Sequence, residues 1–282
     1  EVRQMMHREV DYRLEAKTTE KFRNMLASDP RFIVPRVLPE FSTEHVICST
    51  YEHGHSVSSQ SVRDLPLDRR SALGKAALEL FFRELFIWGE IQTDPNFGNY
   101  RIRIAGEEGA NSETDQIVLL DFGAVQAYSA SFLDPVIQMI RSSYEGDLPG
   151  VVDGGIRLRF MSQDWPEDVL DTFGKVCMSV LEPLSRDRSN WPDEAVNDRG
   201  QYRWKQSDLP SRVARQAARS AISRYFKVPP KEFVFLNRKL IGVYTFIAVL
   251  NAEFNGEDLL REYLYGDPGT PDASSTNQMT KP

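Results

Sequence analysis

Two short polar segments in the first half of the chain contain side chains that can bind a metal ion and phosphate. The first segment reads QTDPNFGNY and includes Asp94 and Asn99; the second reads LLDFG and ends with Asp121, Phe122 and Gly123. Carboxylate and amide oxygens are ligands that Mg²⁺ prefers in proteins, usually together with phosphate and water. The order D-x-x-x-x-N and then D-F-G is that of sites that transfer a phosphoryl group.

This spacing predicts a role for each of the three polar side chains. We expect Asn99 and Asp121 to hold Mg²⁺, and Asp94 to act as the catalytic base or to orient an attacking water. Each motif alone is weak, since either can occur by chance in a chain of 282 residues. Their joint order, between a long helix and a strand pair, favours a phosphoryl-transfer site much more strongly than the alternative, in which these residues only cap loops.

The elements that must position these loops can be read from hydrophobic periodicity. A broad apolar face predicts one long helix over residues 67–91, directly before the first loop. Two strands, NYRIRI and QIVLLD, then follow. If they pair as an antiparallel ribbon, the chain returns and brings Asp121 beside Asn99.

The rest of the chain predicts an α+β fold with a mostly helical second part. A periodic apolar pattern predicts a helix at the start that ends at Asp29-Pro30, and RFIVPRVL and HVICSTYE are typical of short β segments. Further helices are predicted at 129–147, 167–184, 211–226 and 231–254, with a polar surface loop over 186–207 that two tryptophans anchor. The domains we expect are 1–55, a smaller mixed part; 56–265, a helical part; and 266–282, a disordered tail.

Composition narrows the functional class. The net charge of −7 and the pI of about 5.3 argue against a nucleic-acid-binding protein, which normally has a basic face. The longest apolar run, LIGVYTFIAVL, is too short to span a bilayer, so we expect a buried helix and no transmembrane helix. The two cysteines, Cys48 and Cys177, are far apart and in different contexts, which favours free thiols.

Four segments together resemble one family, the UbiB family of atypical kinases, in its mitochondrial Coq-type branch of ubiquinone biosynthesis. They are QTDPNFGNY, LLDFGA, REVDYRLEA and LNRKLIGVY, and the resemblance runs from residue 1 to about residue 265. It implies a protein kinase-like fold and an ATP- and Mg²⁺-dependent kinase or ATPase that supports coenzyme Q biosynthesis. It also implies a mitochondrial location, with coenzyme Q biosynthetic proteins and lipids or the inner-membrane surface as partners.

The resemblance assigns further residues near the start of the chain. Glu9 and Asp11 match the family's E-x-D motif, and Glu15 matches the acid that pairs with a nucleotide-contacting lysine. The alternative is a solvated helix face, partly neutralised by Arg8 and Arg13.

A second segment, ICSTYEHG, matches the strand and hinge that hold adenine. Ser49 would be the gatekeeper, and Tyr51 and Glu52 would form the hinge, with Phe122 and Gly123 completing the nucleotide site. The alternative is that the same residues form only a strand that ends in a turn at the glycine.

One part of a kinase-like site does not appear in the sequence. Kinase-like sites need a glycine- or alanine-rich loop and a strand lysine ahead of the helix that carries Glu15, and the family carries K-x-G-Q upstream. Because the chain begins inside this helix, we expect a fragment with a truncated N-lobe. The acids near Asp121 would then lack their counter-charge, so we expect a raised pKa for at least one of them.

Two other functions fit part of the pattern. Small-molecule phosphotransferases of the aminoglycoside or choline kinase type share the two aspartates and the asparagine, but their loops more often read H-x-D. A non-catalytic pseudokinase that serves as a binding module keeps the fold without turnover. Titration with Mg-ATP separates this last class from the enzymes.

Overall fold

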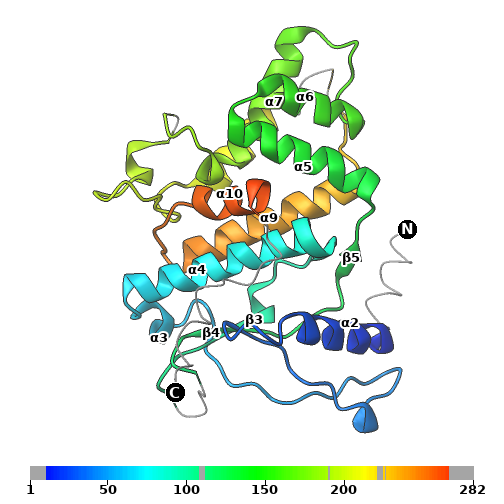
Figure 1. The fold of residues 1–282 in the computed structure, drawn as a ribbon, viewed down its shortest axis with the longest axis vertical. Coiled ribbons are helices and arrows are strands. Elements are labelled where there is room, and N and C mark those ends of the chain that lie inside the picture. The colour runs from blue at the N-terminus through cyan, green and yellow to red at the C-terminus, as the bar shows by residue number, and fades with distance from the viewer. Residues whose placement is uncertain (1–10, 108–111, 190, 221–224, 226, 267–282) are drawn as a thin grey trace, which may run out of the picture.

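The computed structural model describes residues 11–107, 112–189, 191–220, 225 and 227–266, and these form an α+β fold as predicted. Helix α2 (Tyr12–Met25) lies at one end of the molecule with strands β3 (Tyr100–Arg103) and β4 (Gln116–Leu119), and most of the other helices stack above them (Figure 1). The predicted tail lies outside the described residues.

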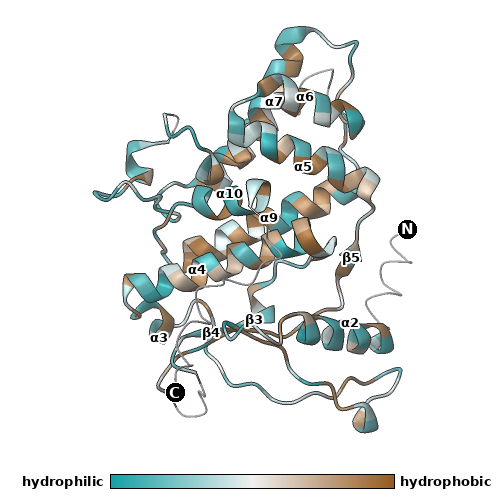
Figure 2. Ribbon diagram, viewed as in Figure 1, coloured by the Kyte–Doolittle hydropathy of each residue, from teal (hydrophilic) through white to brown (hydrophobic). Residues whose placement is uncertain are grey.

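Helix α2 confirms the first predicted helix from residue 12 onward. The carboxylate of Asp11 accepts a hydrogen bond from the backbone N–H of Leu14 at 3.1 Å, which satisfies a free donor of the first turn. The helix surface is mostly polar (Figure 2). Its anchor is Phe22, whose side chain is fully buried.

A three-stranded sheet packs next to this helix in the order β1-β4-β3. Strands β3 (Tyr100–Arg103) and β4 (Gln116–Leu119) pair antiparallel, as predicted, and β1 (Phe32–Ile33) pairs parallel with β4. The segment HVICSTYE contributes only an isolated bridge, between Ser49 and Val37. The second predicted β segment is therefore much shorter than its composition suggested.

The predicted helix over residues 67–91 is wrong at its end. Helix α4 (Leu67–Phe82) continues as one π-helical segment, Arg83–Trp88, and stops at Gly89, whose φ of 63° lies in the left-handed region that favours glycine. Glu90–Gln92 then forms strand β2. Three residues at the end of an apolar run are too few for periodicity to distinguish a helix from a strand.

Strand β2 pairs antiparallel with β5 (Val125–Ala127), which was not predicted. This second ribbon joins the chain before the first polar loop to the chain after D-F-G. It therefore closes the region that holds both motifs.

The helical part is built around α4 and α9 (Lys231–Val249), which lie side by side (Figure 1). The apolar run of α9 is buried, as predicted, and no helix among the described residues is both long and apolar enough to cross a membrane. The other helices are α3 (Gln60–Arg63), α5 (Ala130–Glu145), α6 (Leu148–Arg157), α7 (Glu167–Val180), α8 (Leu209–Ser220) and α10 (Glu257–Tyr265).

Helices α6 and α10 were not predicted. Three glycines lower the helix propensity of α6, but Gly154 lets it approach α5, since a Cβ there would lie 2.2 Å from the Met139 side chain. Tertiary packing therefore overrides local propensity here.

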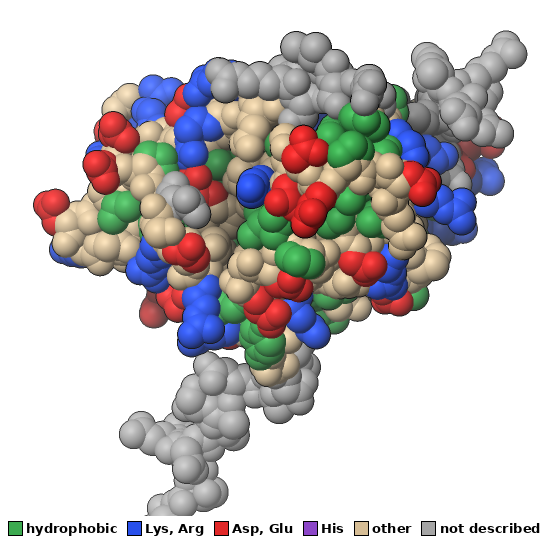
Figure 3. Space-filling view, turned by 90° about the horizontal axis from the view of Figure 1, so that it is seen from above, with side chains coloured by type: hydrophobic (Ala, Val, Ile, Leu, Met, Phe, Trp, Pro, Cys, Tyr) green, Lys and Arg blue, Asp and Glu red, His purple; other side chains and the backbone are tan. Residues whose placement is uncertain are grey.

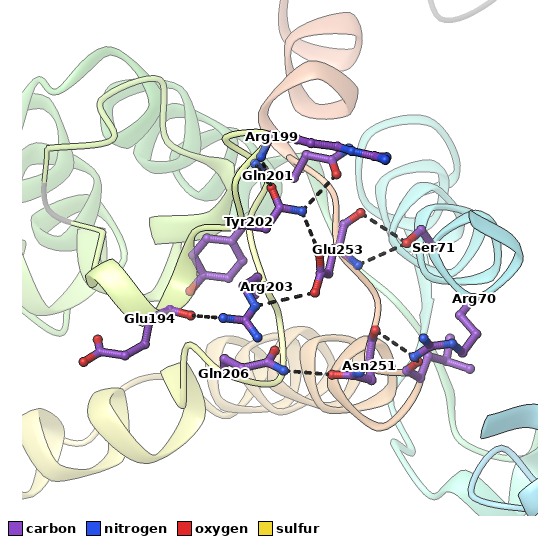
Figure 4. Close-up of polar contacts among 12 residues, drawn as sticks. Arg70, Ser71, Glu194, Arg199, Gln201, Tyr202, Arg203, Gln206, Asn251 and Glu253 are labelled. Atoms are coloured by element: carbon purple, nitrogen blue, oxygen red, sulfur yellow. Dashed lines mark hydrogen bonds and ion pairs between the residues drawn. The ribbon is translucent and has the colours of Figure 1, made fainter. Parts of the chain in front are cut away.

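The polar loop over residues 186–207 is anchored as expected. Trp191, Tyr202 and Trp204 are buried, and the Trp204 indole donates to the Phe254 carbonyl at 3.0 Å. Polar contacts add to this anchor around Glu253, which lies 3.5 Å from the Arg203 guanidinium (Figure 4). The loop is thereby fixed to the connection between α9 and α10.

The surface seen from above carries acidic and basic side chains interspersed (Figure 3). Among the described residues on this face, the basic side chains are scattered and do not gather in one patch. Cys48 and Cys177 are free thiols, as predicted.

We predict that Phe22→Ala destabilises the fold by about 3–5 kcal/mol, since a fully buried aromatic side chain is removed and a cavity remains. Urea unfolding followed by circular dichroism measures this change. Leu14→Ala is the matched control on the same helix, because Leu14 is 46% exposed. An equal loss in both variants would show that Phe22 does not anchor α2.

Candidate functional site

Two ribbons hold the two predicted motifs next to each other. At the β2–β5 end, Thr93 donates from its backbone N–H (3.0 Å) and its Oγ1 (2.8 Å) to the carbonyl oxygen of Ala124. At the β3–β4 end, the N–H of Leu120 donates to the carbonyl oxygen of Asn99 at 2.9 Å. The loops between these ends lie side by side, so the predicted return of the chain to Asn99 is confirmed.

Within the first loop, Asp94 and Asn99 are hydrogen-bonded to each other. The amide nitrogen of Asn99 donates to Asp94 Oδ2 at 2.8 Å, and the N–H of Asn96 donates to Asp94 Oδ1 at 3.3 Å. Because the Asn99 nitrogen faces the carboxylate, its carbonyl oxygen remains available as a metal ligand.

Within the second loop, Asp121 is held close to Gly123. The Gly123 N–H donates to Asp121 Oδ1 at 2.8 Å. A Cβ added to Gly123 would lie 3.4 Å from this oxygen and 3.5 Å from Glu15 Oε2. Two carboxylates, one from α2 and one from D-F-G, therefore flank the same point.

Glu15, Asp94, Asp121 and Gly123 line one pocket of about 530 Å³, whereas Asn99 does not line it and is joined to it through its hydrogen bond to Asp94. Glu15, Asp94 and Asp121 contribute three carboxylates from three different segments, and Arg238 of α9 faces them. The other lining residues are Tyr12, Thr93, Ala124, Val125, Gln126 and Phe235. The structure therefore brings Glu15 together with the two predicted aspartates.

The pocket is electrostatically unfavourable for its own acids. Partial burial raises the pKa of Glu15, and the neighbouring Asp121 carboxylate raises it further. This confirms the expectation of a raised pKa among these acids. A bound cation would offset the repulsion, and the oxygen donors of Asn99 and Asp121 suit Mg²⁺.

No group of three or more His, Cys, Asp or Glu side chains in the described ranges is arranged to hold a metal by itself. The oxygen atoms of a phosphate would have to complete the shell, as is usual for Mg²⁺ in nucleotide sites.

Aromatic packing fixes α2 to the D-F-G segment. The Phe122 side chain is buried, and its ring lies 4.9 Å from that of Phe22, centroid to centroid. Phe22 also contacts Trp88 edge to face at 5.7 Å. Since Phe22 is two turns after Glu15 on α2, this contact sets where the Glu15 carboxylate points.

Helix α9 supports the first loop from the other side. Lys239 and Glu84 form an ion pair at 3.2 Å, with side chains that are only 4% and 2% exposed. A Cβ on Gly242 would lie 2.3 Å from Pro95 Cβ, so only glycine allows this approach. The helix is thereby held directly against the loop that carries Asp94.

The predicted hinge residues lie away from this pocket. Ser49 and Tyr51 are exposed, Tyr51 by 81%, and Glu52 pairs with Arg103 at 2.7 Å. Their assignment to adenine binding stays a prediction. Of the E-x-D pair, Asp11 caps α2 and Glu9 lies outside the described residues.

Sequence reasoning missed the α9 residues of the site. LNRKLIGVY served only as a family motif, although it carries the adjacent cations Arg238 and Lys239 at the start of an apolar run. A charged residue on the apolar side of a buried helix signals a buried partner. That signal pointed to Lys239, but its partner Glu84 is visible only in the fold.

Comparison with protein families and known proteins gives consistent matches. The family model described as ABC1 atypical kinase-like domain matches residues 1–153. The chain is 29% identical to "Atypical kinase coq-8, mitochondrial" of Caenorhabditis elegans, covering 95% of this chain and 33% of that protein. It is 30% identical to "Atypical kinase COQ8B, mitochondrial" of Danio rerio, covering 88% of this chain and 36% of that protein. The chain thus spans about a third of the length of these relatives.

A solved structure resembles the fold. It is described as the complex structure of Rv3197-erythromycin from Mycobacterium tuberculosis, with a TM-score of 0.60 and 18% identity, over 93% of this chain and 60% of that one. At this identity the likeness concerns the fold alone. Together with the family match, it confirms the predicted α+β, kinase-like fold.

We predict that Glu15→Gln raises the thermal midpoint at neutral pH, measured without Mg²⁺. A carboxyl whose pKa is raised on folding stabilises the fold below its unfolded pKa, and this contribution is lost as the pH rises through the raised value. The gain should therefore vanish at pH values below 4.5, the ordinary pKa of a glutamate side chain. Asp121→Asn should lower the pKa of Glu15. A gain that is equal at every pH contradicts this account.

We also predict that Lys239→Met destabilises the fold by about 3–5 kcal/mol, because Glu84 is then buried without a counter-charge. The double variant Glu84→Leu/Lys239→Met should lose less, since it leaves no buried charge. Chemical denaturation of Lys239→Met, Glu84→Leu and the double variant tests this. If the double variant loses the sum of the two single losses, the two side chains are not coupled.

Proposed function

This chain belongs to the ABC1 atypical kinase-like family, as its UbiB-type motifs indicated, and we propose that it binds ATP with Mg²⁺ and transfers or hydrolyses the terminal phosphate. The observation that carries the proposal is that Asp94 and Asp121 line one pocket between two ribbons, with Asn99 hydrogen-bonded to Asp94. Phosphoryl transfer needs little more than such positioned oxygens, a metal ion and an oriented nucleophile.

Each of the three residues has a role in this proposal. The Asn99 carbonyl oxygen and the Asp121 carboxylate hold Mg²⁺, which neutralises charge on the phosphates when it is bound. Asp94 accepts the proton of the attacking hydroxyl or orients a water. The hydrogen bond from Asn99 holds the Asp94 carboxylate in place, so that base and metal ligand are positioned together.

The remaining assignments follow the family resemblance. Glu15 lies in the pocket, where it would pair with a cation close to the nucleotide. Ser49, Tyr51 and Glu52 would contact adenine, and Phe122 and Gly123 would shape the phosphate side.

We further propose that the chain supports coenzyme Q biosynthesis in the mitochondrion. This rests on relatives whose names describe mitochondrial atypical kinases, such as COQ8 of Saccharomyces cerevisiae, which is 24% identical over 90% of this chain. Its partners would be coenzyme Q biosynthetic proteins and lipids or the inner-membrane surface.

We predict that the chain binds Mg-ATP and that Asp121→Asn lowers the affinity at least about tenfold, since loss even of an outer-shell partner costs a metal site that much. Isothermal titration calorimetry measures the affinity. Asp258→Asn on α10 is the matched control, because this carboxylate is 66% exposed and outside the pocket.

Each of the two proposals has an outcome that would contradict it. Absence of Mg-ATP binding would contradict the proposed phosphoryl transfer and favour a non-catalytic binding module. Turnover with choline or an aminoglycoside as acceptor would contradict the role in coenzyme Q biosynthesis and favour a small-molecule phosphotransferase.

A further inference from the structure

We propose that Arg238 of α9 is a phosphate-contacting residue, whose guanidinium binds the terminal phosphate of the nucleotide. This inference rests on the proposed function. It gives a role to LNRKLIGVY, a motif that the metal and base assignments leave unused. It also supplies, from within this chain, a positive charge for the phosphate.

The charge of the pocket calls for such a residue. Among the described residues that line it, Arg238 is the only lysine or arginine, opposite three carboxylates. A nucleotide triphosphate is a polyanion, so these carboxylates alone would repel it. Mg²⁺ offsets part of this repulsion, and a guanidinium facing the same space offsets more.

The contact between Arg238 and Asp94 leaves the guanidinium able to bind a further anion. Their closest nitrogen and oxygen are 3.6 Å apart, and the Arg238 side chain is 58% exposed. Asp94 already accepts hydrogen bonds from Asn96 and Asn99. Because an arginine has five N–H donors in a planar fork, it can approach Asp94 and still bind phosphate oxygens in a bidentate manner.

The helix that carries Arg238 is fixed against the first loop. The next residue, Lys239, is buried in its ion pair with Glu84, and Gly242 lies against Pro95. Successive residues on a helix point about 100° apart, since a turn has about 3.6 residues. Locking Lys239 into the core therefore directs Arg238 toward the pocket.

This placement puts the positive charge where a transferred phosphate would develop charge. Asp94 is the proposed base, and the attacking atom must lie between it and the terminal phosphate. Arginines in other phosphoryl-transfer sites stabilise the transition state from such a position.

The test compares Mg-ATP and Mg-ADP binding by calorimetry in the wild type, Arg238→Gln and Arg238→Lys. We expect Arg238→Gln to weaken Mg-ATP binding about tenfold or more, as for a lost charge-assisted hydrogen bond, and Mg-ADP binding less than about twofold. The Mg-ATP affinity of Arg238→Lys should lie between those of the wild type and Arg238→Gln, since an ammonium keeps the positive charge but not the planar fork of donors.

Arg215→Gln is the matched control, because Arg215 is 62% exposed and pairs with Asp208 at 3.5 Å, outside the pocket. It should change neither affinity. Thermal melts should show all three variants folded, since exposed ion pairs contribute little to stability.

Three results would overturn the inference. The first is that Arg238→Gln weakens the binding of Mg-ATP and of Mg-ADP by the same factor. The second is that Arg238→Gln leaves both affinities unchanged and lowers turnover, which would mean that Arg238 acts only through Asp94. If the wild type binds neither nucleotide, the proposed function fails and this inference fails with it. Binding by the wild type with an unchanged ATP-to-ADP ratio in the variant overturns this inference alone.

Discussion

Antiparallel pairing of residues 90–103 with residues 116–127 is the constraint on which the site depends. The two stretches pair at both ends, as β2–β5 and as β3–β4, and separate in the middle. Asp94 and Asn99 lie in one of the two separated segments, and Asp121 lies in the other. Because both ends are tied, neither loop can move far without breaking a ribbon. The chemistry is therefore placed on short loops whose ends are as rigid as a sheet.

Two helices then approach this frame by different physical means. Helix α2 is held by aromatic packing of Phe22 on Phe122, which is non-directional and tolerates small adjustments. Helix α9 is held by the buried Lys239–Glu84 pair, which fixes one rotation of the helix because neither charge can be left unpaired. Glu15 on α2 can thus shift together with the D-F-G segment, whereas the face that α9 turns toward the pocket is fixed.

The sequence alone was sufficient to predict that the D-F-G segment returns beside Asn99, since the strands between the two motifs have a clear period, and the catalytic roles of the three central residues stay predictions. It was insufficient for β2, where an apolar run continues past Gly89 and periodicity cannot separate a helix end from a short strand. It was also insufficient for the contribution of α9, because residues 84 and 239 meet only after the chain has folded. The pairing of β3 with β4, which follow each other in the chain, was therefore predictable, whereas contacts between residues far apart in the sequence were not.

The excess of carboxylates also bears on which form of nucleotide the pocket can accept. Glu15, Asp94 and Asp121 would repel a nucleotide without metal, and burial together with the neighbouring Asp121 carboxylate raises the pKa of Glu15. A cation relieves both repulsions at once, so nucleotide and Mg²⁺ should bind with positive coupling. By linkage, the same coupling means that nucleotide raises the affinity for Mg²⁺ by the same factor. A pocket with fewer acids would bind free nucleotide better and would lose this dependence on the metal.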